Sequence, residues 1–247
     1  MNNKFYEVFG HQKPVIGMIH TNSDSEMTML ELAQKEIDIY IQNGVYQLIE
    51  DYYGSEEDCE KVMAWIHSEH PEAIYGVNIL GDYSVAFELA EKYGAKFIQI
   101  DSVCGHEEPS EDILFAKDLE TYRMKSNAIV LGGVRFKYQP ILSGRTLKED
   151  LLLGAERCDA IVCTGSGTGI STPMDKVKDF KTHLGDFPVI VGAGVTLDTA
   201  KQTFIEADGA IVGSWFKYMH EAYDMVNEAY VKDFMAEIRE QQALYSD

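Results

Sequence analysis

Acid–base side chains end the first two apolar segments of this chain. His20 ends the segment Val15–His20, and Glu50 and Asp51 end the segment Tyr46–Asp51. An imidazole titrates near neutral pH, so His20 could act as a general acid or base; a histidine merely hydrogen-bonded in place is the alternative. Neighbouring side chains of a strand point to opposite faces, so only one of the two carboxylates can face a pocket. We expect that carboxylate to be Glu50, as a general base or a metal ligand.

Further polar residues follow later apolar segments. Asn78 and Asp101 could orient the hydroxyl groups of a substrate, or they could cap the helices that follow. Lys137 could neutralise a substrate carboxylate or phosphate, or form a Schiff base if desolvation lowers its pKa; an ordinary surface lysine is the alternative. The predicted catalytic residues are His20, Glu50, Asp101 and Lys137, and the predicted substrate-binding residues are Asn78, Arg135 and Thr164.

Three apolar segments in the last third of the chain end in glycine and small hydroxyl residues. They are Ala160–Gly169, Pro188–Thr196 and Gly209–Trp215. Glycine lets backbone N–H groups approach an anion closely, and a helix that follows adds the positive end of its dipole. In eight-stranded α/β barrels, phosphate commonly binds at the loops after the last two strands. The predicted phosphate-binding residues are Gly165, Ser166, Gly167, Thr168, Gly192, Gly194, Gly213 and Ser214.

Several other chemistries find little support in the sequence. The four cysteines show no C-x-x-C spacing, there is no H-x-x-x-H pair, and no serine, histidine and aspartate follow the order of a hydrolase triad. The segment Gly165–Gly169 lacks the lysine of a Walker loop. We therefore predict no dedicated metal or cofactor site, and a divalent metal or an FMN held by its phosphate is left open.

Strand and helix patterns alternate along the whole chain, and they must position these side chains. Apolar, β-branched runs predict strands at Val15–His20, Tyr46–Asp51, Ile74–Ile79, Phe97–Asp101, Ala128–Val134, Ala160–Thr164, Val189–Val191 and Ala210–Val212. Helices are predicted at Thr28–Asn43, Ser55–Glu69, Asp82–Tyr93, Ser110–Met124, Thr146–Arg157, from Pro173 as the first helical residue, at Leu197–Glu206 and at Ala222–Ile238. Eight strands, each followed by a helix, predict a closed parallel (β/α)8 TIM barrel; an open doubly wound sheet is the alternative.

Size and charge narrow the range of partners. The chain has 247 residues and a mass of 27.8 kDa, which suits one barrel domain spanning residues 1–247. Its net charge of −20 repels nucleic acid and anionic membranes, so neither is an expected partner. No apolar run reaches the length of a membrane span, and we expect a cytoplasmic protein that binds a phosphorylated small molecule. A homo-oligomer is left open.

Five segments resemble the BtpA/SgcQ family, in the same order and over essentially the whole chain. They are Lys13–His20, Gly76–Leu80, Val162–Gly169, Val191–Thr196 and Ala207–Lys217. The resemblance is most specific in the last third, and it implies a TIM-type barrel with a phosphate site. One branch of the family is associated with photosystem I accumulation, and another lies beside sugar-transport and sugar-phosphate genes.

Two segments depart from the family. Thr21–Ser25 stands where the family has a proline-rich loop, and Gly133–Tyr138 keeps Lys137 but lacks the aspartate and histidine common beside it. The resemblance therefore carries over to the phosphate end better than to the reacting end, and a shifted substrate or a lost activity stays open.

Three functions are compatible with these features. The leading hypothesis is an enzyme that acts on a sugar-phosphate-like metabolite by lyase or isomerase chemistry, that is, by proton abstraction or by making or breaking a carbon–carbon bond. The second is a non-catalytic assembly or biogenesis factor, like the photosystem I branch of the family. The third is a binder of a flavin or nucleotide phosphate.

Overall fold

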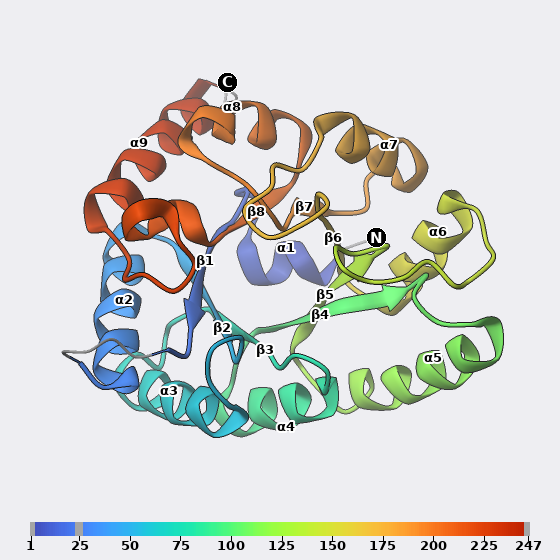
Figure 1. Ribbon diagram of the computed structural model, residues 1–247, viewed down its shortest axis with the longest axis horizontal. Coiled ribbons are helices and arrows are strands. Elements are labelled where there is room, and N and C mark those ends of the chain that lie inside the picture. Colours follow the sequence, from blue (N-terminus) through green and yellow to red (C-terminus); the bar gives the residue numbers. More distant parts are fainter. Residues whose placement is uncertain (1–2, 23–26, 245–247) are drawn as a thin grey trace.

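Eight parallel strands close into a barrel in which each strand pairs with its neighbours in sequence and β8 pairs with β1 (Figure 1). The computed structural model describes residues 3–22 and 27–244. The strands are β1 Val15–His20, β2 Tyr46–Glu50, β3 Tyr75–Asn78, β4 Phe97–Cys104, β5 Ile129–Val134, β6 Ala160–Cys163, β7 Val189–Val191 and β8 Gly209–Val212. The predicted (β/α)8 barrel is therefore confirmed.

Helices surround the barrel (Figure 1), and several of them begin at a residue whose side chain caps the first turn. Thr28 and Thr146 each form a capping box with the glutamate three residues on, which pairs otherwise unsatisfied N–H groups of the first turn. The helices are α1 Lys4–Phe9, α2 Met29–Asn43, α3 Glu56–Glu69, α4 Tyr83–Tyr93, α5 Pro109–Arg123, α6 Leu147–Arg157, α7 Met174–Leu184, α8 Leu197–Glu206 and α9 Glu228–Leu244, with 3₁₀ turns η1 Ser214–Phe216 and η2 Tyr218–His220.

The last predicted helix begins later than expected. Residues 222–227 form a turn, and α9 starts at Glu228 rather than at Ala222. The reason is tertiary: Val226 pairs with Lys217 in an isolated antiparallel bridge, and its N–H donates to the buried carboxylate of Glu36. Both contacts hold the backbone outside the helical hydrogen-bond ladder. Pro173 likewise proved to be the cap before α7 rather than its first helical residue.

The sequence patterns missed the short helix α1, which closes the N-terminal end of the barrel. Its Phe5 and Phe9 are buried, and the ring of Phe9 lies 5.1 Å from the ring of Tyr46 and 5.4 Å from that of Phe97. Two aromatic side chains four residues apart form one apolar face on a helix. This plug fills the bottom of the barrel, so a ligand can enter only from the opposite end.

Strand alternation sorts side chains between the barrel interior and the surrounding helices. In β4, Phe97 packs in the interior cluster, and Gln99 and Asp101 follow at steps of two, whereas Ile98 and Ile100 pack among the helices. The same period in β1 places His20 above two interior apolar residues. Polar side chains therefore occupy the top interior layer of the barrel, where the strands end.

Two further observations bear on the earlier expectations. In the described part of the chain, no helix is both long and apolar enough to cross a bilayer. The loop at Thr21–Ser25, which departs from the family pattern, has its residues 23–25 outside the described part.

Candidate active site

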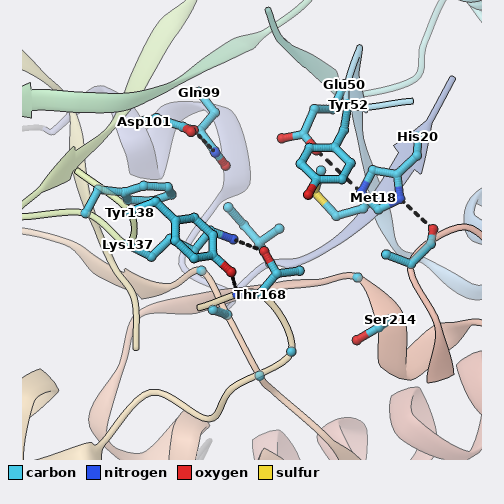
Figure 2. Close-up of a pocket in the computed structure, with 18 of the residues that line it drawn as sticks. Met18, His20, Glu50, Tyr52, Gln99, Asp101, Lys137, Tyr138, Thr168 and Ser214 are labelled. Carbon is cyan, nitrogen blue, oxygen red and sulfur yellow. Dashed lines mark hydrogen bonds and ion pairs between the residues drawn. The ribbon is translucent and has the colours of Figure 1, made fainter. Parts of the chain in front are cut away.

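A cavity of about 170 Å³ opens at the carboxyl ends of the strands, opposite the α1 plug. Ionisable side chains lie on two of its sides, and glycine-rich loops form another (Figure 2). Of the residues predicted from the sequence, nine line this cavity: His20, Glu50, Asp101, Lys137, Thr168, Gly192, Gly194, Gly213 and Ser214. Residues from seven strands or the loops that follow them thus converge on one space.

His20 is held in a fixed orientation at the end of β1. Its Nδ1 lies 2.9 Å from the carbonyl oxygen of Ala222, and its Nε2 lies 3.4 Å from Oε2 of Glu50. A carbonyl oxygen can only accept, so Nδ1 must carry a proton. The other ring nitrogen, Nε2, faces the Glu50 carboxylate. The two side chains are close enough to form an ion pair when the ring is protonated.

Glu50 and Asp101 share one amide donor. Nδ2 of Asn78 donates to Oε1 of Glu50 at 2.9 Å and to Oδ1 of Asp101 at 3.2 Å, and Nε2 of Gln99 donates to the same Asp101 oxygen at 3.0 Å. Burial, and then the nearby charge of Glu50, raise the pKa of Asp101. Asp101 therefore keeps a proton more readily than a solvated aspartate does, as a general acid requires.

Asp51 shows the orientation expected for the neighbour of an inward carboxylate. Its Oδ1 accepts a hydrogen bond of 2.9 Å from the backbone N–H of Leu80, whereas Glu50 lines the cavity. Of these two neighbouring carboxylates, Glu50 is therefore the one that lines the cavity.

Lys137 lies across the cavity from the histidine, in the loop after β5 (Figure 2). Its Nζ donates to Oγ1 of Thr168 at 3.3 Å, and its backbone N–H donates to Oγ1 of Thr164 at 2.9 Å. The phenol of Tyr138 accepts a hydrogen bond of 2.8 Å from the N–H of Thr168, which lowers the pKa of Tyr138. These contacts tie the loops after β5 and β6 together and place one cation beside them.

The loop after β7 requires glycine at position 194. Gly194 has a φ of +65°, and a Cβ there would lie 2.3 Å from the backbone carbonyl group of Ile170. Helix α8 begins shortly afterwards at Leu197, so the positive end of its dipole adjoins this loop. Gly213, after β8, leaves an open space in which a Cβ would approach only the side chain of Met18, at 3.4 Å. Both glycines line the cavity.

The remaining predicted residues do not line the cavity. Arg135 donates to Asp150 at 2.9 Å and to the carbonyl oxygen of Arg145 at 2.7 Å, so its guanidinium is committed elsewhere. Asn78 and Thr164 act on their neighbours: Asn78 holds the two carboxylates, and Thr164 supports the backbone of Lys137. Gly165, Ser166 and Gly167 belong to the first part of the β6 loop, which contributes Thr168 and Gly169 to the lining.

Eleven of the lining residues were not among the predicted site residues, and Gln99, Tyr52, Tyr138 and Ala222 are four examples. Gln99 had a readable signal, because it precedes Asp101 by two positions and so shares its face of β4. Tyr52 and Tyr138 lie in loops, where no periodicity fixes their direction. Ala222 contacts His20 through its backbone carbonyl oxygen, and no local sequence pattern predicts such a contact.

The arrangement holds no obvious metal site. Within residues 3–22 and 27–244, no group of three or more histidine, cysteine, aspartate or glutamate side chains is arranged to hold a metal ion. The loops after β7 and β8 could hold the phosphate of a cofactor as well as that of a substrate, since both offer the same anion.

Comparison with known proteins places the chain among barrels of this kind. The solved structure described as "Native KDPGal structure" has a TM-score of 0.64 at 16% identity, covering 93% of this chain and 96% of the other. Phosphoribosyl anthranilate isomerase from Thermus thermophilus has a TM-score of 0.62 at 13% identity, covering 92% of this chain and 98% of the other. At such identities the likeness shows the fold alone.

Sequence comparison gives the family. The putative sgc region protein SgcQ of Escherichia coli is 25% identical over 262 residues, which cover 94% of this chain and 96% of that protein. The sequence model of the BtpA family matches residues 11–240, from the start of the first strand region into the last helix. The resemblance read from the five sequence segments is therefore confirmed: the chain belongs to the BtpA family.

Proposed function

We propose that this protein is an enzyme that binds a phosphorylated, sugar-phosphate-like metabolite at the barrel mouth and acts on it by lyase or isomerase chemistry. One observation carries the proposal. A His20–Glu50 pair with Nε2 and Oε2 3.4 Å apart, and a carboxyl of raised pKa, Asp101, face the same cavity as the glycine-rich ends of β7 and β8. One side of the cavity suits an anion and the other suits proton transfer.

The phosphate is assigned to the loops after β7 and β8. Backbone N–H groups near Gly194 and Gly213, with the hydroxyl of Ser214, would bind its oxygens, whereas the N–H of Gly192 already donates to the carbonyl oxygen of Cys163 at 2.9 Å. Lys137 supplies a positive charge from the side of the β5 loop, which the net charge of −20 makes necessary for an anionic ligand. Thr168 would complete the contact, since its hydroxyl already lies 3.3 Å from the lysine Nζ.

The reacting carbon is assigned to the opposite side of the cavity. Glu50 would remove a proton from a carbon next to a carbonyl group and pass it to Nε2 of His20. Asp101, protonated, would donate a hydrogen bond or a proton to the oxygen on which negative charge develops. The same three groups serve isomerisation, in which the proton returns to a neighbouring atom, and lysis, in which a carbon–carbon bond breaks instead.

The structural neighbours support this choice of chemistry. They include a protein described as a 4-hydroxy-2-oxoglutarate aldolase/2-deydro-3-deoxyphosphogluconate aldolase, and phosphoribosyl anthranilate isomerase. The four cysteines are free and buried, which suits the reducing conditions of the cytoplasm, where we place this activity. We propose a small molecule as the partner, because the negative charge of the chain opposes nucleic acid.

Lys137 allows one specific variant of the lyase reaction. Its amine could condense with a substrate carbonyl, losing water to give an imine that withdraws electrons from the adjacent carbon. Borohydride would reduce that imine and leave the substrate attached to Lys137, which mass spectrometry of the digested protein would locate. Attachment at another lysine would remove this variant and leave the acid–base reaction standing.

A screen of sugar phosphates in deuterated water tests the proposed function as a whole. We expect at least one member to stabilise the folded protein against heat and to exchange a carbon-bound proton with solvent. Glu50→Gln should abolish exchange while keeping the thermal protection. Absence of protection and exchange across the screen, with tight capture of a partner protein, would favour the assembly factor. A stoichiometric yellow chromophore in the purified protein would favour the flavin reading.

A further inference from the structure

A fully buried ion pair lies outside the cavity, between α2 and the loop after β8. Nζ of Lys217 lies 3.2 Å from Oε1 of Glu36, and both side chains are completely buried. The same oxygen of Glu36 accepts a hydrogen bond of 2.8 Å from the backbone N–H of Val226. Burying two charges is costly unless they are paired and further hydrogen-bonded, so a pair in this position requires an explanation.

The pair fixes both ends of one loop. Lys217 and Val226 are partners in an isolated antiparallel bridge, and the N–H of Tyr218 donates to the carbonyl oxygen of Met225 at 3.0 Å. The carboxylate of Glu36 therefore contacts both ends of the loop. It pairs with the side chain of Lys217 at one end and accepts from the backbone N–H of Val226 at the other. Residues 218–225 project between these two anchors as a closed turn, which lies beside the end of β1 in Figure 1.

The tip of this loop holds the catalytic histidine. The carbonyl oxygen of Ala222 accepts from Nδ1 of His20 at 2.9 Å, and the carbonyl oxygen of Tyr223 accepts from Nδ2 of Asn22 at 2.5 Å. A chain of contacts thus runs from Glu36 through Val226 and Ala222 to the ring of His20. The side chain of Glu36 does not reach the cavity itself.

We propose that Glu36 and Lys217 are positioning residues that set the tautomer of His20. With Nδ1–H committed to Ala222, the lone pair of a neutral ring is on Nε2, beside Glu50 in the cavity. Without that carbonyl oxygen the proton is free to move to Nε2, which then cannot accept a proton from the substrate side. The inference rests on the proposed function only for the importance of His20 and deepens it by naming what orients that residue.

The tautomer can be read directly and without a substrate. Nitrogen-15 NMR of the folded protein, recorded at a pH well above the titration range of imidazole, distinguishes a protonated Nδ1 from a protonated Nε2. The signals of His20 are assigned as those missing from His20→Gln. In the wild type we expect the Nδ1–H form to predominate.

The decisive variant is the double substitution Glu36→Ala with Lys217→Met. It removes both charges together, so no unpaired charge is left buried, and it leaves the N–H of Val226 without its acceptor. We expect a folded protein in which the Nδ1–H form of His20 falls from the major to the minor tautomer. In the activity found by the sugar-phosphate screen, we expect kcat to fall at least tenfold with KM little changed.

A matched control separates this effect from general loss of stability. Asp208 accepts from Nζ of Lys181 at 2.7 Å and from the backbone N–H of Val189 at 2.8 Å, the same type of contact set at the far end of β8. Asp208→Ala with Lys181→Met should therefore lower stability and leave the tautomer of His20 unchanged.

Two results would overturn the proposal. One is a wild-type tautomer in the folded Glu36→Ala/Lys217→Met protein, and the other is an equal change in the control. If the double variant does not fold, Glu36→Gln with Lys217→Met replaces it, since this pair also leaves no buried charge and the amide keeps an oxygen for Val226. We then expect a smaller but measurable rise of the Nε2–H form, and no rise would reject the proposal. Since no substrate is needed, failure of the proposed function leaves this result interpretable.

Discussion

The two sides of the cavity are built from different parts of the polypeptide. On the β7–β8 side the lining is formed by Gly192, Gly194 and Gly213, and close packing leaves no room for a Cβ at the first two. On the β1–β4 side they are ionisable side chains held by one another, as Asn78 holds Glu50 and Asp101. The first side is set by local conformation, and the second by contacts between strands.

This difference predicts how the two sides respond to mutation. A change on the glycine side alters the shape of the backbone and should weaken ligand binding. A change on the carboxylate side alters proton affinity and should weaken turnover more than binding. The following experiments test that separation, from the largest expected effect to the smallest.

Replacing Glu50 by glutamine should have the largest effect on turnover. The amide keeps the size of the side chain and removes its basicity, so we expect kcat to fall by about two to four orders of magnitude, with ligand affinity nearly unchanged. The measurement is solvent-deuterium exchange with the sugar phosphate identified by the screen. Asp51→Asn is the control, because that carboxylate binds Leu80 N–H outside the cavity. Equal losses in both variants would contradict the assignment.

Replacing Gly194 by alanine should remove anion binding. The new Cβ would meet the backbone of Ile170 at 2.3 Å at a φ of +65°, so the loop must move. Since hydrogen bonds to a charged group contribute about 1.5–3 kcal/mol each, losing one or two should weaken phosphate binding by about 100-fold. Thermal shift against phosphate concentration measures this.

Gly185→Ala is the matched control for that experiment. Gly185 also has a positive φ, +61°, but a Cβ there would meet nothing within 4 Å, and it lies after α7 rather than in the cavity. The Gly185→Ala protein should be less stable than the wild type, and phosphate should still raise its Tm. A Gly194→Ala protein that phosphate still protects fully would show that the anion binds elsewhere.

Replacing Lys137 by methionine should weaken binding of a phosphorylated ligand by about tenfold, less than the glycine change does. The lysine contributes one charge-assisted contact, whereas the loop contributes several backbone groups. Titration calorimetry of wild type, Lys137→Met and Lys148→Met measures the difference, because Lys148 is an exposed lysine of α6 whose loss changes the net charge equally. An equal loss in Lys148→Met would mean that only the overall charge matters.

Replacing Asp101 by asparagine should raise stability modestly at neutral pH. The folded state holds the proton of Asp101 more tightly than the unfolded state, because burial and the charge of Glu50 raise its pKa above the ordinary value of 3.8. Stability therefore falls as the pH rises from 3.8 through the folded pKa, and above it the ionised carboxylate destabilises the fold. The amide removes this penalty, and we expect the Tm to rise by about 2–4 °C, the shift that 1 kcal/mol gives in a domain of this size.

The same measurement at low pH checks the sign. Below pH 3.8 the carboxyl is protonated in both the folded and the unfolded state, so Asp101→Asn and the wild type should have the same Tm. Asp233→Asn, an exposed change on α9, should match the wild type at every pH. A loss of stability at neutral pH in Asp101→Asn would indicate that the carboxylate stabilises the fold.

Much of the fold could be predicted from the sequence, because its determinants are local. Continuous apolar, β-branched runs located the strands, and pairs such as Thr28 with Glu31 located helix starts within a residue or two. Alternation then placed Glu50 inward and Asp51 outward. The left-handed backbone of Gly194 is also a local determinant, since only glycine adopts this conformation without strain.

Only the tertiary structure decided which polar groups meet. Lys217 and Glu36 lie far apart in the sequence, yet their burial together turned the predicted start of a helix at Ala222 into a loop. Elsewhere in the fold, Arg135 donates a hydrogen bond to Asp150 of α6 and lies outside the cavity, whereas Lys137 lines it. Side-chain partners depend on which strands and loops the closed barrel brings together, and the free energy of a buried charge depends on those partners. Residue type and spacing therefore determined the barrel and its glycine-rich side, whereas packing determined the proton-transfer side.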